Sequence, residues 1–370
     1  MEADKKHTRR VLTLCLVVVL LVFGFPTAVF VSQNGGIDEQ EKCSEQFAKT
    51  SGGLGDFVKS GAELCGLQLV ALQKIADQFH PTRGELDKLI DLSIPNESTV
   101  CSTTGSTLTL QLPEASPIGA GQYITIEKPP TRTLSGKKVI ALSFDDGPTA
   151  EVTPVVLDVL KEEGVKATFF ELGQAVNAYP YISKRVVEEG HTLGSHSFLH
   201  RSITRQPLGD VSYSWRETLL DIYDATGKVI TTFRPPHGFS SAESVSRIKG
   251  EIVNFGPSAD DWIGLSGDEV TAKVVNTATN GSIILLHDSQ RVEMWALKNT
   301  IEQLKEKGFE FVTVDEIIQH QSGFPIAFYQ LNDVNTFNIT PESTISERVG
   351  NSAMTFLYQI GAKEYSEATG

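Results

Sequence analysis

Two adjacent carboxylates, Asp145 and Asp146, are the first side chains in the sequence whose spacing points to chemistry. They close an apolar run, Val139-Ile140-Ala141-Leu142, and Gly147-Pro148 follows them. The apolar run predicts a buried strand, and the Gly-Pro pair predicts a turn directly after it. Adjacent side chains on a strand point in opposite directions, so both aspartates can serve one site only where the strand is ending. One could then bind a metal while the other handles protons; on this stretch alone, an Asp-rich surface turn is an equally good interpretation.

Two histidines four residues apart, His196 and His200, could supply further metal ligands. On a helix this spacing would place both imidazoles within reach of one ion. With Asp146 they would make a three-ligand set that leaves positions open on a divalent metal. Such a metal can polarise a carbonyl and lower the pKa of a bound water towards neutrality. An HxxxH pair alone is weakly specific, and two surface histidines are the alternative.

Three more segments carry polar side chains at or after apolar runs. Arg234 could hold a carboxylate in its ionised form and in a fixed direction, or it could close a loop through a structural ion pair. Trp262, which follows Asp261, could wall a sugar pocket or fill the core. His287 follows the apolar run 282–286, and a lone histidine in that position is usually structural.

Together and in this order, the segments FDDGP, HSFLH, FRPPHG, DDW and LLHD resemble the motifs of the polysaccharide deacetylase family, the NodB-like carbohydrate esterases. This family includes chitin deacetylases and peptidoglycan N-acetylglucosamine deacetylases. The resemblance covers roughly residues 137–320, and the motifs are highly specific as a set. It implies metal-dependent hydrolysis of N-acetyl groups from N-acetylglucosamine units of a cell-wall or extracellular polysaccharide, peptidoglycan or chitin-like, with release of acetate.

The resemblance also implies a role for each matching residue. Asp145 would be the general base, steadied by Arg234, and His287 would be the general acid, oriented by Asp261. The implied metal ligands are Asp146, His196 and His200. The implied substrate contacts are Pro236, His237, Trp262 and Leu285, of which the last two would line the acetyl pocket. Zinc is the expected metal, with Co²⁺, Mn²⁺ or Ni²⁺ as other options, and no further cofactor is needed.

Two positions depart from the family pattern. Ser258 stands where the family often has an aspartate four positions before the tryptophan, and His237 stands where a tyrosine usually follows the prolines. If the family role of the second position is to donate its backbone amide to the oxyanion, His237 can still fill it. The departures therefore bear on groove shape and substrate choice more than on the chemistry. Since Arg234 and a cation would favour the ionised form of Asp145, we expect a lowered pKa there, and a raised pKa for His287 beside Asp261.

Two other functions are compatible with parts of this pattern. Two histidines and one carboxylate also form the ligand set of non-haem iron oxygenases, but that function leaves Asp145, His287 and Arg234 without a role. The chain could instead be a membrane-anchored carbohydrate-binding protein on a deacetylase scaffold that has lost catalysis. Against this, every chemical position that the resemblance identifies is filled.

The elements that must position these residues alternate between strand and helix from Lys137 onward. Repeated βα units of this kind predict a parallel sheet with helices outside, here a distorted (β/α) barrel of about seven strands. The expected strands are 138–143, 167–171, 191–194, 231–234, 251–255, 282–286 and 310–313. The expected helices between them are Thr153–Glu163, Tyr181–Glu189, Val211–Thr226, Asp268–Thr277 and Val292–Lys307.

The amino-terminal end predicts attachment to a membrane. Basic residues crowd the tail 1–10, and no charged residue occurs from Val11 to Ile37. The run is long enough for a bilayer, which needs about 20 residues, and no good small-x-small cleavage site follows it. We therefore expect residues 11–32 to be an uncleaved signal anchor, with the basic tail in the cytoplasm and the rest extracellular or periplasmic. The protein would be secreted if the segment were cleaved.

Composition and cysteine placement fill in the remaining organisation. A net charge of -14 disfavours nucleic acid and anionic membrane surfaces as partners. Residues 33–136 are expected to form a small module and linker, helical over 38–93 with strands at 107–112 and 122–126, and with a boundary near 128–136. Cys43, Cys65 and Cys101 permit one disulfide of unknown pairing. The extension 321–370 follows the expected catalytic domain, 137–320.

Overall fold

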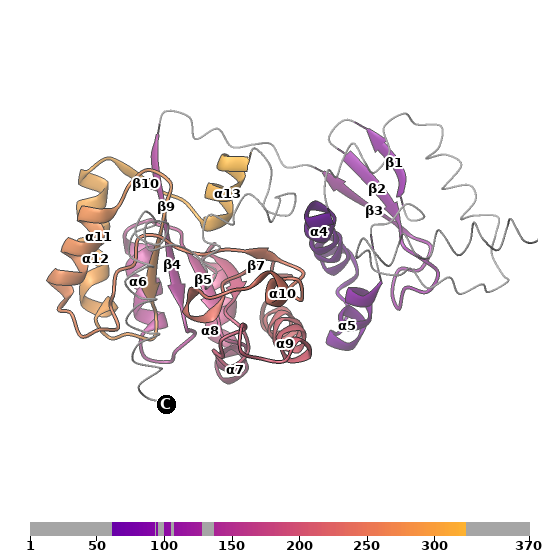
Figure 1. Cartoon of the computed structure of the whole chain (residues 1–370). Helices are drawn as coiled ribbons and strands as arrows, with labels where there is room; N and C mark the ends of the chain where they lie inside the picture. Colours follow the sequence, from indigo (N-terminus) through magenta and orange to yellow (C-terminus); the bar gives the residue numbers. More distant parts are fainter. Residues whose placement is uncertain (1–60, 93, 95–99, 105–106, 128–136, 323–370) are drawn as a thin grey trace, which may run out of the picture. The chain divides into compact units, whose positions relative to one another are not determined.

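The computed structural model describes residues 61–92, 94, 100–104, 107–127 and 137–322 (Figure 1). Before residue 128, helices α4 (Gly61–Phe79) and α5 (Arg83–Asp91) precede three strands, β1 (Val100–Thr104), β2 (Thr107–Gln111) and β3 (Tyr123–Glu127). These strands form an antiparallel sheet in the order β1-β2-β3, and α4 packs against β3. Helix α5 begins with a capping box between Thr82 and Glu85.

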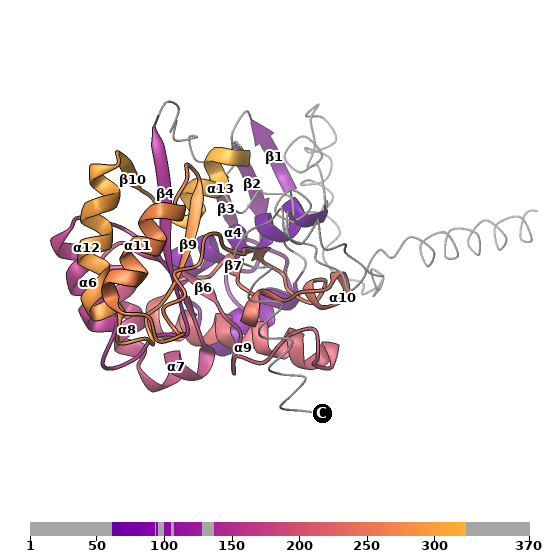
Figure 2. The same cartoon turned by 60° about the vertical axis from the view of Figure 1, so that its left-hand side comes forward.

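The rest of the described chain is built on a seven-stranded sheet in which every pairing is parallel (Figures 1 and 2). Its strands are β4 (Lys138–Asp145), β5 (Thr168–Glu171), β6 (Thr192–Ser195), β7 (Thr232–Phe233), β8 (Glu251–Ile252), β9 (Ser282–His287) and β10 (Phe309–Phe311). β4 pairs with β5, β9 and β10. The segment after β8 bridges β9 at Gly256–Ile283 and Ser258–Leu285. The sheet therefore curls back towards β9, in the manner of a distorted (β/α) barrel.

Helices cover this sheet, and because they bury its strands, the strands are apolar. They are α6 (Thr153–Glu162), α7 (Gly173–Ala178), α8 (Pro180–Glu188), α9 (Leu208–Thr226), α10 (Ala242–Val245), α11 (Gly267–Thr277), α12 (Glu293–Glu306) and α13 (Val314–Ser322), with a single 3-10 turn, η1, at Pro236–Gly238. Neighbouring helices pack in the order α11, α12, α6, α8, α9. Because side chains fill both sides of a covered parallel sheet, β4 is buried at every residue after Lys138.

The strand ends bring the motif residues to one edge of the sheet. Asp145 is the last residue of β4 and His287 the last of β9, and the register of these strands pairs the two residues directly. His196 follows β6 and Arg234 follows β7. Carboxyl ends of neighbouring parallel strands meet at the same edge, which is where sites are built in βα folds.

All seven predicted strands of the large sheet are confirmed, as are the five predicted helices between them, with ends shifted by up to three residues. The strands near 107–112 and 122–126 are confirmed as β2 and β3. Within the described part of the predicted helical stretch 38–93, the chain breaks at Pro81 into α4 and α5. The sequence did not indicate β1, α7, α10 or α13.

Several predictions concern residues outside the described ranges. They are the membrane anchor 11–32, the boundary near 128–136, the extension beyond 322, and the side chains of Cys43, Cys65 and Cys101. Among the helices that are described, none combines the length and apolar character needed to cross a bilayer.

Candidate active site and metal centre

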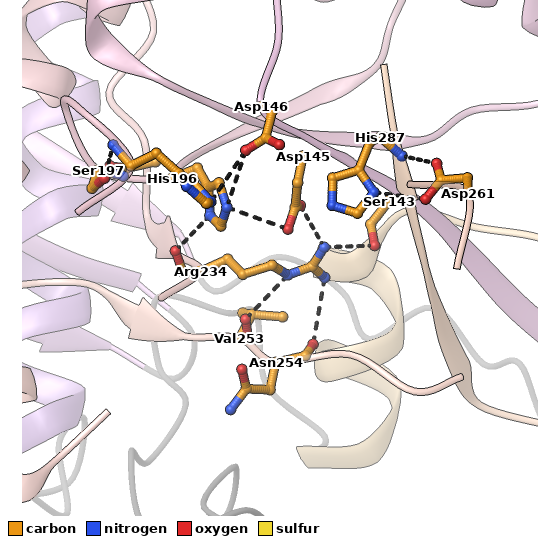
Figure 3. Close-up of polar contacts among 12 residues, drawn as sticks. Ser143, Asp145, Asp146, His196, Ser197, Arg234, Val253, Asn254, Asp261 and His287 are labelled. Atoms are coloured by element: carbon orange, nitrogen blue, oxygen red, sulfur yellow. Dashed lines mark hydrogen bonds and ion pairs between the residues drawn. The ribbon is translucent and has the colours of Figure 1, made fainter. Parts of the chain in front are cut away.

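The predicted metal ligands lie together after the carboxyl ends of β4 and β6, and Figure 3 shows two of them, Asp146 and His196, side by side. Asp146 Oδ1 is 3.6 Å from His196 Nε2 and 3.3 Å from His200 Nε2. One ligand atom from each of the three residues lies within 4.8 Å of the others. Asp146 Oδ1 is buried and makes no hydrogen bond within the described structure, although a carboxylate oxygen out of water normally has a partner. A cation would satisfy it, so the residues present fit a metal.

The hydrogen bond of His196 prepares its ring for a metal. His196 Nδ1 lies 2.8 Å from the backbone oxygen of Arg234. Since that carbonyl can only accept, Nδ1 carries the proton and Nε2 presents its lone pair towards Asp146. Burial lowers the pKa of His196 to about 3, which keeps the imidazole neutral as a ligand must be.

His196 and His200 do not lie on a helix, which was one way in which their spacing could bring both imidazoles to one ion. The chain leaves β6 and bends through residues 196–200, with positive φ at Ser197 (71°) and His200 (57°). The Ser197 hydroxyl accepts from the His200 amide at 3.0 Å, and the Phe198 amide donates to Ser214 Oγ of α9 at 2.7 Å. The bend brings the two ring centroids to 4.9 Å.

Arg234 is held against Asp145 in the interior. Its Nη1 donates to Asp145 Oδ1 at 2.7 Å and to Ser143 Oγ at 2.9 Å. Its guanidinium carbon lies 4.0 Å from the centroid of the Phe170 ring and 5.5 Å from that of Phe255, so the cation is also in contact with aromatic faces. Arg234 is completely buried, and this set of contacts leaves its side chain one position.

The pKa of Asp145 moves in the direction opposite to our expectation. Burial raises it, and the charge of Arg234 lowers it by less. The predicted fall is therefore wrong for the protein groups alone, because the sequence could not show that Asp145 is only 2% exposed. A cation at Asp146 would add a second positive charge that favours the ionised form.

His287 and Asp261 form a pair on the other side of Asp145 (Figure 3). His287 Nδ1 donates to Asp261 Oδ1 at 2.8 Å, and the His287 amide donates to Asp261 Oδ2 at 2.7 Å. Burial lowers the pKa of His287, but the hydrogen bond and charge of Asp261 outweigh it and raise the pKa to about 9. The imidazole is therefore protonated at neutral pH, as expected from the sequence, and its Nε2 is the nitrogen left to meet a substrate.

The predicted substrate residues lie around these groups. The Trp262 ring contacts His287, with centroids 4.9 Å apart, and packs with Phe255 and Leu285 in a small apolar cluster. His237 has a positive φ of 60°, and its ring centroid is 4.5 Å from that of His200. Pro236 is buried beside it. An acetyl methyl could thus meet apolar side chains close to the polar groups.

Sequence reasoning missed four residues that build the site. Ser143 and the rings of Phe170 and Phe255 hold Arg234, and Asp288 lies buried after His287. Ser143 and Asp288 carried a signal, since each is a polar residue next to a motif at the end of an apolar run. Nothing in the sequence separates the two phenylalanines from ordinary core residues.

Backbone strain is concentrated at this site. Within the described ranges, six residues other than glycine have positive φ, and five of them belong to the motif segments: Asp146, Ser197, His200, His237 and Asp260. Residues with a β-carbon occupy this region at a cost, and such strain gathers where a site dictates the backbone path.

The chain is similar to proteins of one known family. Residues 133–250 match the family described as polysaccharide deacetylase. A solved structure described as T48 deacetylase with substrate is 34% identical, covers 52% of this chain and 95% of its own, and superposes with a TM-score of 0.50. The chain belongs to the polysaccharide deacetylase family.

Two relatives that the chain matches over part of their length are bacterial proteins. Peptidoglycan-N-acetylglucosamine deacetylase PgdA of Listeria monocytogenes is 40% identical over 193 residues, which are 52% of this chain and 41% of that protein. Peptidoglycan-N-acetylmuramic acid deacetylase PdaC of Bacillus subtilis is 34% identical over 197 residues, 53% of this chain and 42% of that protein. The chain thus matches about two fifths of the length of each, and the two relatives are named for different sugars.

Proposed function

We propose that this deacetylase removes N-acetyl groups from N-acetylglucosamine units of a bacterial cell-wall polysaccharide, with peptidoglycan as the first candidate, and releases acetate. The observation that carries the proposal is the placement of two proton-handling groups around the three metal ligands. Asp145 is hydrogen-bonded to Arg234, and its Oδ2 lies 3.6 Å from His196 Nε2. His287 is hydrogen-bonded to Asp261 and ends β9, the strand that pairs with β4. The names of the relatives support the substrate class.

The metal requirement is part of the proposal. Asp146, His196 and His200 would hold a divalent cation, with zinc as the first candidate. When bound, the cation would lower the pKa of a water and polarise the acetamide carbonyl.

The protein side chains would divide the remaining work. Asp145, ionised and fixed by Arg234, takes a proton from the attacking water, whose oxygen bonds to the carbonyl carbon. The backbone amide of His237 is the candidate hydrogen-bond donor to the acetamide oxygen, which becomes negative when the water adds to the carbonyl carbon. His287 Nε2 then protonates the sugar nitrogen as the carbon–nitrogen bond breaks, leaving acetate and a free amine. This order needs Asp145 deprotonated and His287 protonated together, and Asp261 favours the second condition.

The test is acetate release by the full chain from peptidoglycan fragments and from acetylated chitooligosaccharides, with and without a chelator. We expect release from at least one substrate, loss with chelator, and recovery with zinc. Asp145→Asn should abolish release while the metal content stays at one per chain. Asp260→Asn is the matched control, because Asp260 is a buried neighbour of Asp261 that pairs with Lys273 instead.

Two outcomes would contradict the proposal. If the wild-type chain bound these glycans without releasing acetate, it would be a binding protein on the family scaffold. If release continued undiminished after complete metal removal, the three-ligand site would have no part in the reaction. Mass spectrometry of the products would show which sugar had lost its acetyl group.

The location of the protein is proposed from the sequence. A cell-wall substrate lies outside the cytoplasm, and the apolar segment 11–32 behind a basic tail would anchor the enzyme there.

A further inference from the structure

A second buried carboxylate, that of Asp288, lies at the same edge of the sheet and has no role in the chemistry above. Asp288 follows His287 directly and is completely buried. Asp288 is the first residue after β9, and its carboxyl contacts Thr153 and the turn at Gly147, whereas His287 pairs with Asp261. Asp288 Oδ2 accepts a hydrogen bond of 2.6 Å from the hydroxyl of Thr153, at the start of α6.

The Asp288 carboxyl lies against the turn that follows Asp145 and Asp146. A β-carbon placed on Gly147 would be 2.1 Å from Asp288 Oδ2 and 2.4 Å from Oδ1, far closer than atoms can approach. Only glycine therefore fits at this point of the FDDGP turn. The carboxyl occupies the space that any other residue at position 147 would need.

Hydrogen bonds close a small network around this contact. The Thr149 hydroxyl donates to the backbone oxygen of Asp288 at 2.8 Å, and the Thr149 amide donates to the Thr153 hydroxyl at 2.7 Å. On the other side of the turn, the Leu172 amide donates to the Gly147 oxygen at 2.9 Å. The turn after Asp146 is thus held between the ends of β9 and β5.

We propose that Asp288 is a positioning residue for the deacetylation reaction. With Thr153 it holds the turn 146–149 against the end of β9, and so fixes Asp145 and Asp146 relative to His287. This rests on the proposed function, since the separation matters only if these groups share one reaction. The carboxyl touches no substrate and acts through the turn alone.

The kinetic consequence follows from the precision that the reaction needs. A displacement of about 1 Å at a reacting group can lower the rate about 100-fold. Asp288→Ala removes the contact with Gly147 and the acceptor for Thr153, and we expect kcat to fall by about that factor with little change in KM. Asp288→Asn keeps the shape and one acceptor oxygen, so it should retain more than about a third of kcat. Thr153→Ala should lower kcat, and the double variant Thr153→Ala/Asp288→Ala should be no worse than Asp288→Ala.

The chain offers a matched control in Ser183. Its hydroxyl is also completely buried and also donates to a buried carboxylate, Glu171 Oε2, at 2.7 Å, but Ser183 lies in α8 and takes part in none of the hydrogen bonds described above for the turn 146–149. Ser183→Ala removes the same kind of bond and should keep wild-type kcat. If Ser183→Ala and Thr153→Ala lowered kcat equally, the effect would be general loosening of the core and the proposal would be wrong.

A second measurement does not depend on activity. Hydrogen–deuterium exchange of the full chain should be faster for the peptide containing Gly147–Thr153 in Thr153→Ala and Asp288→Ala, and unchanged there in Ser183→Ala. An unchanged rate in all three variants, or full kcat in a folded Asp288→Ala protein with its metal bound, would overturn the positioning role. If the wild-type chain released no acetate, the proposed function would fail while the exchange result still decided whether Asp288 holds the turn.

Discussion

Replacing Asp261 by asparagine should move the alkaline limit of activity, because Asp261 is the group that keeps His287 protonated. The two side chains meet through Nδ1 and Oδ1 at 2.8 Å, and the same carboxylate accepts from the His287 amide at 2.7 Å. Asparagine keeps nearly the same shape and loses the charge. What remains is the effect of burial, which lowers the pKa of His287, and the individually smaller effects of the Asp145 and Asp146 charges, which raise it.

The size of the change can be worked from the pKa. A rise from 6.5 to about 9 corresponds to roughly 3 kcal/mol in favour of the imidazolium. Without the charge of Asp261, burial should bring the pKa of His287 back towards 6.5, against the smaller raising effects of the Asp145 and Asp146 charges. At pH 7.5 a pKa of 6.5 leaves only about a tenth of the residue protonated, so kcat/KM should fall by up to about tenfold there. A bound metal lowers the pKa in both proteins, so the difference between them is the quantity to compare.

The free energy of unfolding should also depend on whether His287 is protonated. The folded pKa of His287 lies above its unfolded value, so folding is favoured by the protonated form. This contribution is complete below about pH 6.5 and is lost as the pH rises through about 9. Unfolding by urea should therefore show a smaller stability difference between wild type and Asp261→Asn at pH 9.5 than at pH 6.

The assay is the initial rate of acetate release between pH 5.5 and 10, with Asp260→Asn measured beside Asp261→Asn. The control should keep the wild-type alkaline limb. If Asp261→Asn also kept it, with metal bound and the fold intact, then His287 would not be the acid whose protonation limits the rate.

Three further predictions concern the metal, the base and the topology. His196→Ala should lose both metal and activity, and stoichiometric metal by elemental analysis of the purified variant would disprove the ligand assignment. Arg234→Met should raise the pKa of Asp145 further, because burial is then opposed only by the weaker effects of His287 and His200. Since the base must be ionised, the acid limb of kcat/KM should move to higher pH, and an unmoved limb would remove Arg234 from that role. If residues 11–32 anchor the chain, protease added to intact cells should digest residues 33–370, whereas a protected carboxy-terminal domain or a mature protein starting near residue 33 would contradict the anchor.

Much of the catalytic fold was predictable because its signals are local. Each strand of the large sheet is a short apolar run, and the residues with chemistry stand where those runs end, as Asp145 and His287 do. Parallel strands then bring separate motifs together without any further information. The sequence did not predict the short helices, because α7 has six residues and α10 has four, too few for a helical period to show.

What the sequence could not give depends on distant contacts. Phe170 and Phe255 reach Arg234 from different parts of the sheet, and no spacing in the sequence marks them. The pKa of Asp145 depends on how completely it is buried, which only the packed structure shows. The bend through His196 and His200 depends on Ser214 of α9, 18 and 14 residues further along the chain respectively, so the spacing alone could not show the path of the chain between the two histidines.

The positive φ angles of the motif segments have a consequence for engineering this protein. Asp146, His200 and His237 hold conformations that cost about 1 to 3 kcal/mol each in a residue with a β-carbon and almost nothing in glycine. Replacing one of them by glycine should therefore raise the melting temperature of the metal-free chain while destroying its site. Directed evolution that selected only for heat resistance would therefore favour variants that have lost the site. Selection for stability should keep these three positions fixed and vary other residues.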